Sequence, residues 1–224
     1  SQKWVHDSLK RHLMAKRDAV TANPADPDAL PPLVPDVIAE DTLWACTTCG
    51  YCEAACPIEL EHLPKLYRMR QHRVLMEGAF PHELKPVFEA YEAQSNPWGF
   101  PADTRGDWAR DLGIVRVETA DQVRDLDYLF YVGSAASFDP RGQKIARAFA
   151  AIMQQAGVRF GILGPAETST GECVRRAGNE MLFQQLANDL AAKLNGLGVV
   201  RIVTCDPHAF NSLKNEYPEF GGRW

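Results

Sequence analysis

The chain has 224 residues, of which 24 are Lys or Arg and 29 are Asp or Glu, so its formal net charge is −5. A hydrophobic fraction of 46% is normal for a globular protein and excludes wholesale disorder. The mild acidity and the lack of a long basic block exclude a dedicated nucleic-acid binder. No stretch approaches the roughly 18 consecutive apolar residues of a membrane helix, so we expect no membrane span in this chain.

The first hundred residues favour helices around a proline-rich connector. Apolar residues repeat at helical spacing over 2–20, and again over 63–74 and 84–91. Residues 22–36 contain five prolines, so we expect an extended connector there. The run Pro-Trp-Gly-Phe-Pro at 97–101 breaks the chain and marks the expected end of the first domain.

The second half alternates strand and helix patterns. Short apolar runs that end at turn residues predict strands at 127–133, 158–164, 199–204 and, at an edge, 113–117. Helical patterns fall between them, around 145–156 and 181–194. This alternation predicts a short parallel sheet with covering helices. We therefore expect an α+β chain with a helical domain over 1–100 and an α/β domain over 101–224.

Six cysteines are the most informative residues. Four form one run with the spacing C-x2-C-x2-C-x3-C-P: Cys46, Cys49, Cys52 and Cys56, followed by Pro57. The other two, Cys173 and Cys205, stand alone. The run matches that of [4Fe-4S] ferredoxins, because a cubane cluster needs thiolates that converge from a tightly turning backbone, which Gly50 permits. Clustered thiols beside unpaired ones indicate a reducing compartment, so we expect a cytoplasmic protein.

Two alternatives concern the metal and its ligands. Structural zinc usually uses two C-x2-C pairs separated by a longer spacer, which this run does not provide, so we favour iron–sulfur. In two-cluster ferredoxins the fourth cysteine of such a run binds the other cluster. Cys56 therefore either completes the local ligand set or serves a second cluster whose remaining ligands lie upstream or on a partner.

Residues 43–57 resemble the second ferredoxin-type motif of the iron–sulfur oxidoreductases related to heterodisulfide reductase, including the membrane-associated electron-transfer-flavoprotein oxidoreductases of bacteria. The likeness continues through 69–71, 96–99, 131–133, 177–180 and 210–218. The resemblance implies the second half of a helical ferredoxin-like domain followed by one cysteine-rich CCG-type repeat. It also implies that the first cluster motif lies upstream and a second repeat downstream.

The repeat departs from the family where the family usually carries cysteine. This chain has Ser134, Ser169, Asp206 and Ala209 at those positions, so the resemblance implies a repeat without its usual cluster thiols. Cys173 and Cys205 lie at neighbouring positions that the family does not use. A hydroxyl is a weak iron ligand compared with a thiolate, so we do not expect a noncubane cluster there.

Several chemistry-bearing residues follow the predicted strands, and the carboxyl ends of parallel strands meet at one edge of a sheet. We therefore expect these to be neighbours: Ser134, Ser169, Thr170, Cys173, Cys205, Asp206 and His208. Three interpretations compete. The first is a vacated pocket held by hydrogen bonds. The second is a metal site or missing fourth ligand supplied by Cys205 or Cys173, with His208. The third is a thiol nucleophile formed by Cys205 and His208.

These features predict an electron-relay module, a component of an iron–sulfur oxidoreductase. We expect it to pass electrons between a flavoprotein-type donor, or another iron–sulfur subunit, and a membrane or disulfide acceptor at the cytoplasmic face of the membrane. The alternative is a noncatalytic scaffold or assembly module. Lys65, Arg68, Arg70 and Arg73 form a basic stripe beside the cysteine run, which we interpret either as a solvated helix face or as a docking surface for an acidic redox partner.

Overall fold

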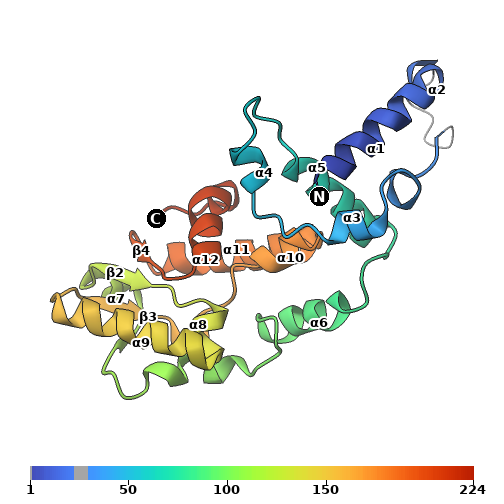
Figure 1. Ribbon diagram of the computed structural model, residues 1–224. Coiled ribbons are helices and arrows are strands. Elements are labelled where there is room, and N and C mark those ends of the chain that lie inside the picture. The colour runs from blue at the N-terminus through green and yellow to red at the C-terminus, as the bar shows by residue number, and fades with distance from the viewer. Residues whose placement is uncertain (1, 23–29) are drawn as a thin grey trace. The chain divides into compact units, whose positions relative to one another are not determined.

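The structure is a computed structural model that describes residues 2–22 and 30–224 (Figure 1). The first part of the predicted connector, at 23–29, lies outside the described residues. The chain forms two compact units. One runs up to Pro81 and includes Arg176–Gly178, and the other comprises His82–Arg175 and Asn179–Trp224.

The first unit is helical, as predicted. Its elements are α1 (Gln2–Ala15), α2 (Arg17–Ala22), η2 (Leu33–Val37), α3 (Glu40–Trp44), α4 (Tyr51–Ala54), α5 (Leu63–Gln71) and η3 (His72–Met76). The predicted helix over 2–20 is therefore two helices that part at Lys16. The described part of the connector is not uniformly extended, since it contains the short helical turn η2. Val5 of α1 and Leu66 of α5 are buried in one core with Val34, Ile38 and Leu43.

The second unit carries the sheet. Its elements are α6 (Leu84–Gln94), η4 (Ala102–Ala109), β1 (Val115–Arg116), α7 (Ala120–Arg124), β2 (Tyr128–Phe130), α8 (Ser134–Phe138), α9 (Pro140–Gln155), β3 (Phe160–Ile162), η5 (Gly164–Ala166), α10 (Glu172–Arg176), α11 (Glu180–Gly196), β4 (Ile202–Val203), α12 (Pro207–Asn211), η6 (Ser212–Glu216) and η7 (Tyr217–Phe220). Every predicted strand is present but shorter than its apolar run.

The four strands are parallel and lie in the order β1-β3-β2-β4. Leu129 of β2 is in register with Gly161 of β3 on one side and with Ile202 of β4 on the other. Parallel strands need crossover connections. Helix α9 connects β2 to its neighbour β3, and α11 connects β3 to β4, which lies beyond β2 in the sheet. The predicted α+β class with a short parallel sheet is confirmed.

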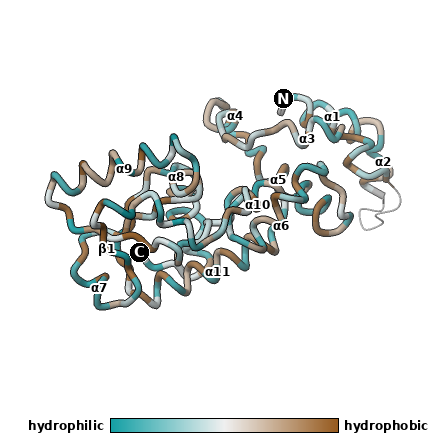
Figure 2. The backbone as a smooth tube through the Cα atoms, turned by 90° about the horizontal axis from the view of Figure 1, so that it is seen from below, coloured by the Kyte–Doolittle hydropathy of each residue, from teal (hydrophilic) through white to brown (hydrophobic). Residues whose placement is uncertain are grey.

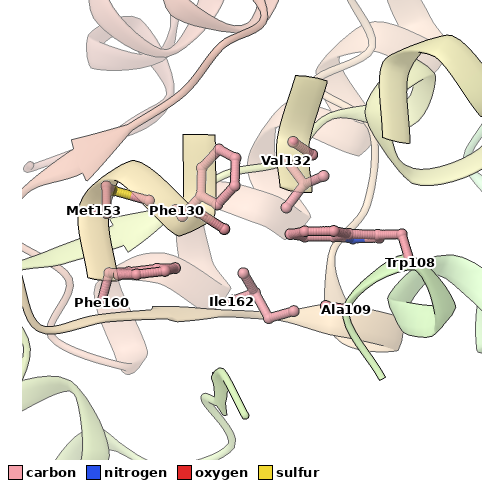
Figure 3. Packing of buried hydrophobic residues seen from close by; sticks show 9 residues of the cluster. Trp108, Ala109, Phe130, Val132, Met153, Phe160 and Ile162 are labelled. Carbon is pink, nitrogen blue, oxygen red and sulfur yellow. The ribbon is translucent and has the colours of Figure 1, made fainter. Parts of the chain in front are cut away.

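The core of the second unit lies between the sheet and α9 (Figure 3). Ala146, Ala150 and Met153 follow one face of α9 and pack against side chains of β2 and β3. Phe130 of β2 meets Trp108 edge to face, with ring centroids 6.1 Å apart. Hydrophobic and hydrophilic stretches alternate along α9 and α11, which lie on opposite sides of the sheet (Figure 2).

The predicted break at 97–101 is an ordered loop. The side chain of the fully buried Asn96 accepts hydrogen bonds from Trp98 N–H and Phe100 N–H and donates to the Phe100 carbonyl (2.8 Å). Ser169 N–H donates to the Ser95 carbonyl at 3.2 Å, which places the end of α6 in the second unit. The division into domains 1–100 and 101–224 stays a prediction, because packing alone does not test independent folding.

Within the described residues, no helix combines the length and the apolar character that crossing a bilayer requires.

Candidate metal centre

The cysteine run begins in the loop between α3 and α4, continues through α4, which contains Cys52, and ends in the segment that follows α4 (Figure 1). Thr48 and Gly50 both adopt left-handed backbone conformations, with φ of +56° and +77°. Two such residues on either side of Cys49 turn the chain sharply, and glycine does so without a Cβ penalty. Cys49 is exposed, whereas Cys46, Cys52 and Cys56 are partly exposed.

Backbone N–H groups point at the sulfur atoms of this run. Thr48 N–H donates to Cys46 Sγ at 3.4 Å, and Leu60 N–H donates to Cys56 Sγ at 3.4 Å. The backbone N–H of Tyr51, followed by the Thr47 side chain, lowers the pKa of Cys49. Donors of this kind stabilise a thiolate, the form of cysteine that binds metal.

Two arginines bind the backbone of the same loop. Arg70 is buried, and its Nη2 donates to the carbonyl oxygens of Leu43 and Cys46 at 2.7 Å each. Arg176 Nη1 donates to the Thr48 carbonyl at 2.7 Å and to its hydroxyl at 3.0 Å. The Arg70 guanidinium also lies 5.2 Å from the Trp44 ring, and Trp44 packs against the core together with Cys46. The loop is thus held in place by its carbonyl groups.

The predicted basic stripe is not one uniform solvated face. Lys65 and Arg68 are exposed, but Arg70 is buried under the cysteine loop. Arg73 is mostly buried and forms ion pairs with Glu40 and Glu77. The interpretation as a single solvated face was wrong because two of the four side chains have partners in the first unit.

The segment after Cys56 is fixed by a carboxylate of α4. Glu53 Oε1 accepts hydrogen bonds from the N–H groups of His62 (2.5 Å) and Leu63 (2.6 Å). The buried His62 faces His6 of α1, and the two ring nitrogens are in direct contact. Burial, followed by the proximity of His62 and Lys65, lowers the pKa of His6.

In residues 2–22 and 30–224, no three His, Cys, Asp or Glu side chains converge as a preformed metal site. The donor set nevertheless fits an iron–sulfur cluster. It offers four thiols within eleven residues, a loop with two left-handed turns, and N–H groups directed at the sulfurs.

The carboxyl ends of the strands in the second unit hold a buried ion pair. Glu167 accepts hydrogen bonds from Val132 N–H and Gly133 N–H, each 2.9 Å long. Arg105 Nη1 lies 3.7 Å from Glu167 Oε1, and Arg105 Nη2 donates to Ser134 Oγ at 2.7 Å. Burial raises the pKa of Glu167, and the Arg105 charge opposes this shift. The ion pair therefore bonds directly to Ser134, one of the predicted pocket residues.

The other predicted residues of this edge mostly stabilise local turns. Asp206 accepts from the N–H groups of His208 (2.9 Å) and Ala209 (3.2 Å) and so caps α12. The Thr170 carbonyl accepts from Tyr217 Oη at 3.0 Å, and Ser169 Oγ accepts from Gly171 N–H at 3.2 Å. These bonds position backbone rather than a ligand.

The two lone cysteines lie in different surroundings. Cys173 is exposed and forms a side-chain hydrogen bond with Tyr91, whose pKa is raised mainly by burial. Burial raises the pKa of Cys205, which is the opposite of what activates a thiol nucleophile. His208 Nδ1 pairs with Glu172 Oε1 at 3.0 Å. No observation on the described residues thus favours a thiol nucleophile built from Cys205 and His208.

Sequence reasoning missed Arg105, Arg176 and Glu172. Each lies far along the chain from its partner, and none belongs to a local motif. Only the resemblance over 177–180 pointed to the neighbourhood of Arg176.

The chain is similar in sequence to known iron–sulfur and redox proteins. The chain is 39% identical over 229 residues to the probable iron-sulfur-binding oxidoreductase FadF of Bacillus subtilis, covering 97% of this chain and 32% of the relative. It is 37% identical over 194 residues to the EtfAB:quinone oxidoreductase of Syntrophomonas wolfei, covering 86% of this chain and 27% of the relative. A component of the dihydromethanophenazine:CoB–CoM heterodisulfide reductase of Methanosarcina barkeri is 22% identical over 190 residues, which is 82% of this chain and 44% of the relative.

The chain is related to the CCG-type iron–sulfur oxidoreductases. The expected relationship is thereby confirmed. The chain spans between a quarter and a third of the length of the first two of these relatives. No family model matches the chain, and no solved structure does either.

Proposed function

We propose that the loop over 46–56 binds one [4Fe-4S] cluster through its four thiolates and that the chain is an electron-transfer component of an iron–sulfur oxidoreductase. The proposed ligands are Cys46, Cys49, Cys52 and Cys56. The observation that carries the proposal is the set of backbone N–H groups directed at the sulfurs of this run. The name of the Bacillus relative, an iron-sulfur-binding oxidoreductase, supports it.

A [4Fe-4S] cluster, when bound, supplies one-electron redox chemistry at a potential set by its surroundings. The residues of this chain would determine those surroundings. Thr48 N–H and Leu60 N–H stabilise negative charge on the ligating sulfurs. The buried Arg70 adds a positive charge behind Cys46, which also favours the more negative, reduced state.

The outer side of the loop is open for electron exchange. Cys49 is exposed, and the large apolar side chains of Tyr51 and Ile58 are 75% and 72% exposed. We propose that a redox protein, either a flavoprotein or another iron–sulfur subunit, contacts the loop here. The names of the quinone oxidoreductase and heterodisulfide reductase relatives support a quinone or a disulfide as the acceptor. We propose in addition that the acceptor is membrane-associated or a disulfide and that the chain acts at the cytoplasmic face of the membrane.

Anaerobic reconstitution with iron and sulfide tests the cluster. We expect about four iron atoms per chain, absorption near ~400 nm and an EPR signal on reduction. Cys49→Ser should abolish these signals, and Cys173→Ser is the matched control that should retain them. A chain that binds no iron, or a Cys49→Ser variant with an intact cluster, would overturn the assignment. Zinc at one ion per chain would point to the competing metal.

A second candidate function concerns the α/β unit alone. The ion pair of Arg105 and Glu167 bonds to Ser134 at the strand ends, which favours a noncatalytic scaffold over a second cluster site. In that case a physiological partner should bind the iron-free chain and the reconstituted chain equally. Binding that requires the cluster would contradict the scaffold function.

A further inference from the structure

Strand β4 forms one edge of the sheet, because the described residues place only β2 beside it (Figure 1). Leu129 N–H and Tyr131 N–H of the β2 segment donate to the carbonyls of Arg201 and Val203, each at 2.9 Å. Neighbouring residues of a parallel strand direct their backbone groups to opposite sides. The N–H and C=O of Ile202 therefore point away from β2, toward an edge with no strand from the described chain.

A groove of about 330 Å³ runs along this edge. Apolar side chains make up much of its lining: Val200, Ile202, Phe210, Leu213 and Trp224. Val200 is 70% exposed and Phe210 is 55% exposed, so the lining offers apolar surface for burial.

The charged side chains that line the groove are both positive. Arg201 and Lys214 line it, and no Asp or Glu side chain of the described residues does, although Asp127 outside the groove lies near Arg201. Each cation lies over an aromatic ring, Arg201 at 5.0 Å from Tyr128 and Lys214 at 5.2 Å from Phe210. The chain as a whole carries a net charge of −5, whereas both charged side chains that line the groove are cations.

We propose that this edge binds an extended acidic segment of a partner protein, which adds beside β4 as a fifth strand. The segment would form main-chain hydrogen bonds with Ile202, place alternate apolar side chains in the groove, and direct its carboxylates toward Arg201 and Lys214. An exposed strand edge is a template for pairing, and the two cations select the charge of the added strand.

A second copy of this chain is a poorer occupant. Two β4 edges paired about a two-fold axis would bring Arg201 and Lys214 of both copies into the same groove. Like charges at a strand interface destabilise it. An acidic segment would replace this repulsion with attraction and is therefore the better occupant.

A fluorescent peptide in which Glu and Val alternate is a suitable probe, titrated into the full chain by anisotropy at low salt. Two control peptides match it, one with Lys in place of Glu and one with N-methyl groups on every second residue. We expect the Glu peptide to bind about tenfold or more tightly than either control. Hydrogen exchange should slow at the Ile202 amide when the Glu peptide is present.

Lys214→Glu should weaken binding of the Glu peptide about tenfold, whereas Lys144→Glu, an exposed substitution on α9, should leave it unchanged. Ile202→Pro removes the outward N–H and should abolish binding; circular dichroism establishes whether that variant folds, and Lys214→Glu tests the proposal independently. Equal affinity for the Lys peptide, or undiminished affinity of Lys214→Glu, would overturn the proposal. The proposal would also fail if the parent chain were a dimer in solution and Ile202→Pro made it a monomer, because β4 would then pair with a second copy of itself.

Discussion

The guanidinium of Arg70 donates through Nη2 to the carbonyl oxygen of Cys46 at 2.7 Å. The same nitrogen binds the Leu43 carbonyl, and Nη1 binds the Arg176 carbonyl at 2.8 Å. One buried side chain therefore fixes the backbone on which the first cysteine of the run is placed. This relationship makes Arg70 a positioning residue for the loop.

We predict that Arg70→Met destabilises the first unit by about 3 kcal/mol, because one buried and two partly buried hydrogen bonds to carbonyl groups lose their charged donor. Iron retained after reconstitution should fall in parallel. Arg68→Met, on the same helix but exposed, is the matched control and should change neither quantity. Urea unfolding and iron analysis measure the two effects, and an unchanged unfolding midpoint in Arg70→Met would contradict the assigned role.

Cys49 and Cys205, both exposed, should differ in how their alkylation rates depend on pH in the iron-free chain. The pKa of Cys49 is lowered by the Tyr51 N–H and the Thr47 side chain, whereas burial raises the pKa of Cys205. Because the thiolate is the reactive form, alkylation of Cys49 should reach its half-maximal rate at a lower pH than alkylation of Cys205. Mass spectrometry of iodoacetamide-treated protein gives both rates, and the reverse order would refute the prediction.

Glu167 should be intolerant of even a conservative change. Glu167→Gln keeps the shape, but its amide NH₂ must face one of the two N–H groups that now donate to the carboxylate. We expect a loss of about 1–3 kcal/mol in the free energy of unfolding. Glu118→Gln, at an exposed side chain, should stay within about 0.5 kcal/mol of the parent protein. Chemical denaturation followed by Trp fluorescence separates the two outcomes.

Acidification should loosen the first unit through His6. Its pKa is lowered in the fold by burial and by His62 and Lys65, so the unfolded chain takes up the proton more readily. The folded state keeps its full stability above the ordinary histidine pKa of about 6.5, where His6 is neutral in both states. It loses stability as the pH falls below that value, because the unfolded chain then binds the proton more readily. The unfolding midpoint should therefore drop between neutral and mildly acidic pH. His6→Gln should flatten this dependence and His12→Gln should not; equal curves for His6→Gln and the parent would disprove it.

Local sequence patterns predicted the secondary-structure elements, because short-range burial of apolar residues determines where these elements form. The apolar runs before turn residues located β2, β3 and β4, and the helical repeats located α9 and α11, because each element buries one face of its own sequence. The cysteine spacing located the candidate loop for a similar reason. The strands are shorter than predicted because the ends of each apolar run leave the ladder and enter the loops at the sheet edge.

Contacts between distant residues had no such signal. The helical repeat placed Arg70 among three other basic residues, but only the fold reveals that its side of α5 meets the carbonyls of Leu43 and Cys46. The pairing of Arg105 with Glu167 joins residues 62 positions apart, so no periodicity reports it. The strand ends do hold hydrogen-bonded side chains, but the bonds of Arg105 and Glu167 were not foreseen, and the vacated pocket predicted at this edge stays a prediction.

The return of Arg176–Gly178 to the first unit bears on how the protein is made. The Arg176 side chain binds Thr48, and Gly178, with φ of +94°, lies where an added Cβ would be 2.6 Å from the Arg70 carbonyl. During synthesis, the chain must therefore emerge from the ribosome as far as residue 178 before the loop around Cys46 and Cys49 can adopt its final conformation. A chain truncated at residue 100 would contain all four clustered cysteines yet lack Arg176, which binds the loop, and Gly178, which packs against Arg70, so two separate stretches of sequence build the surroundings of the cysteines.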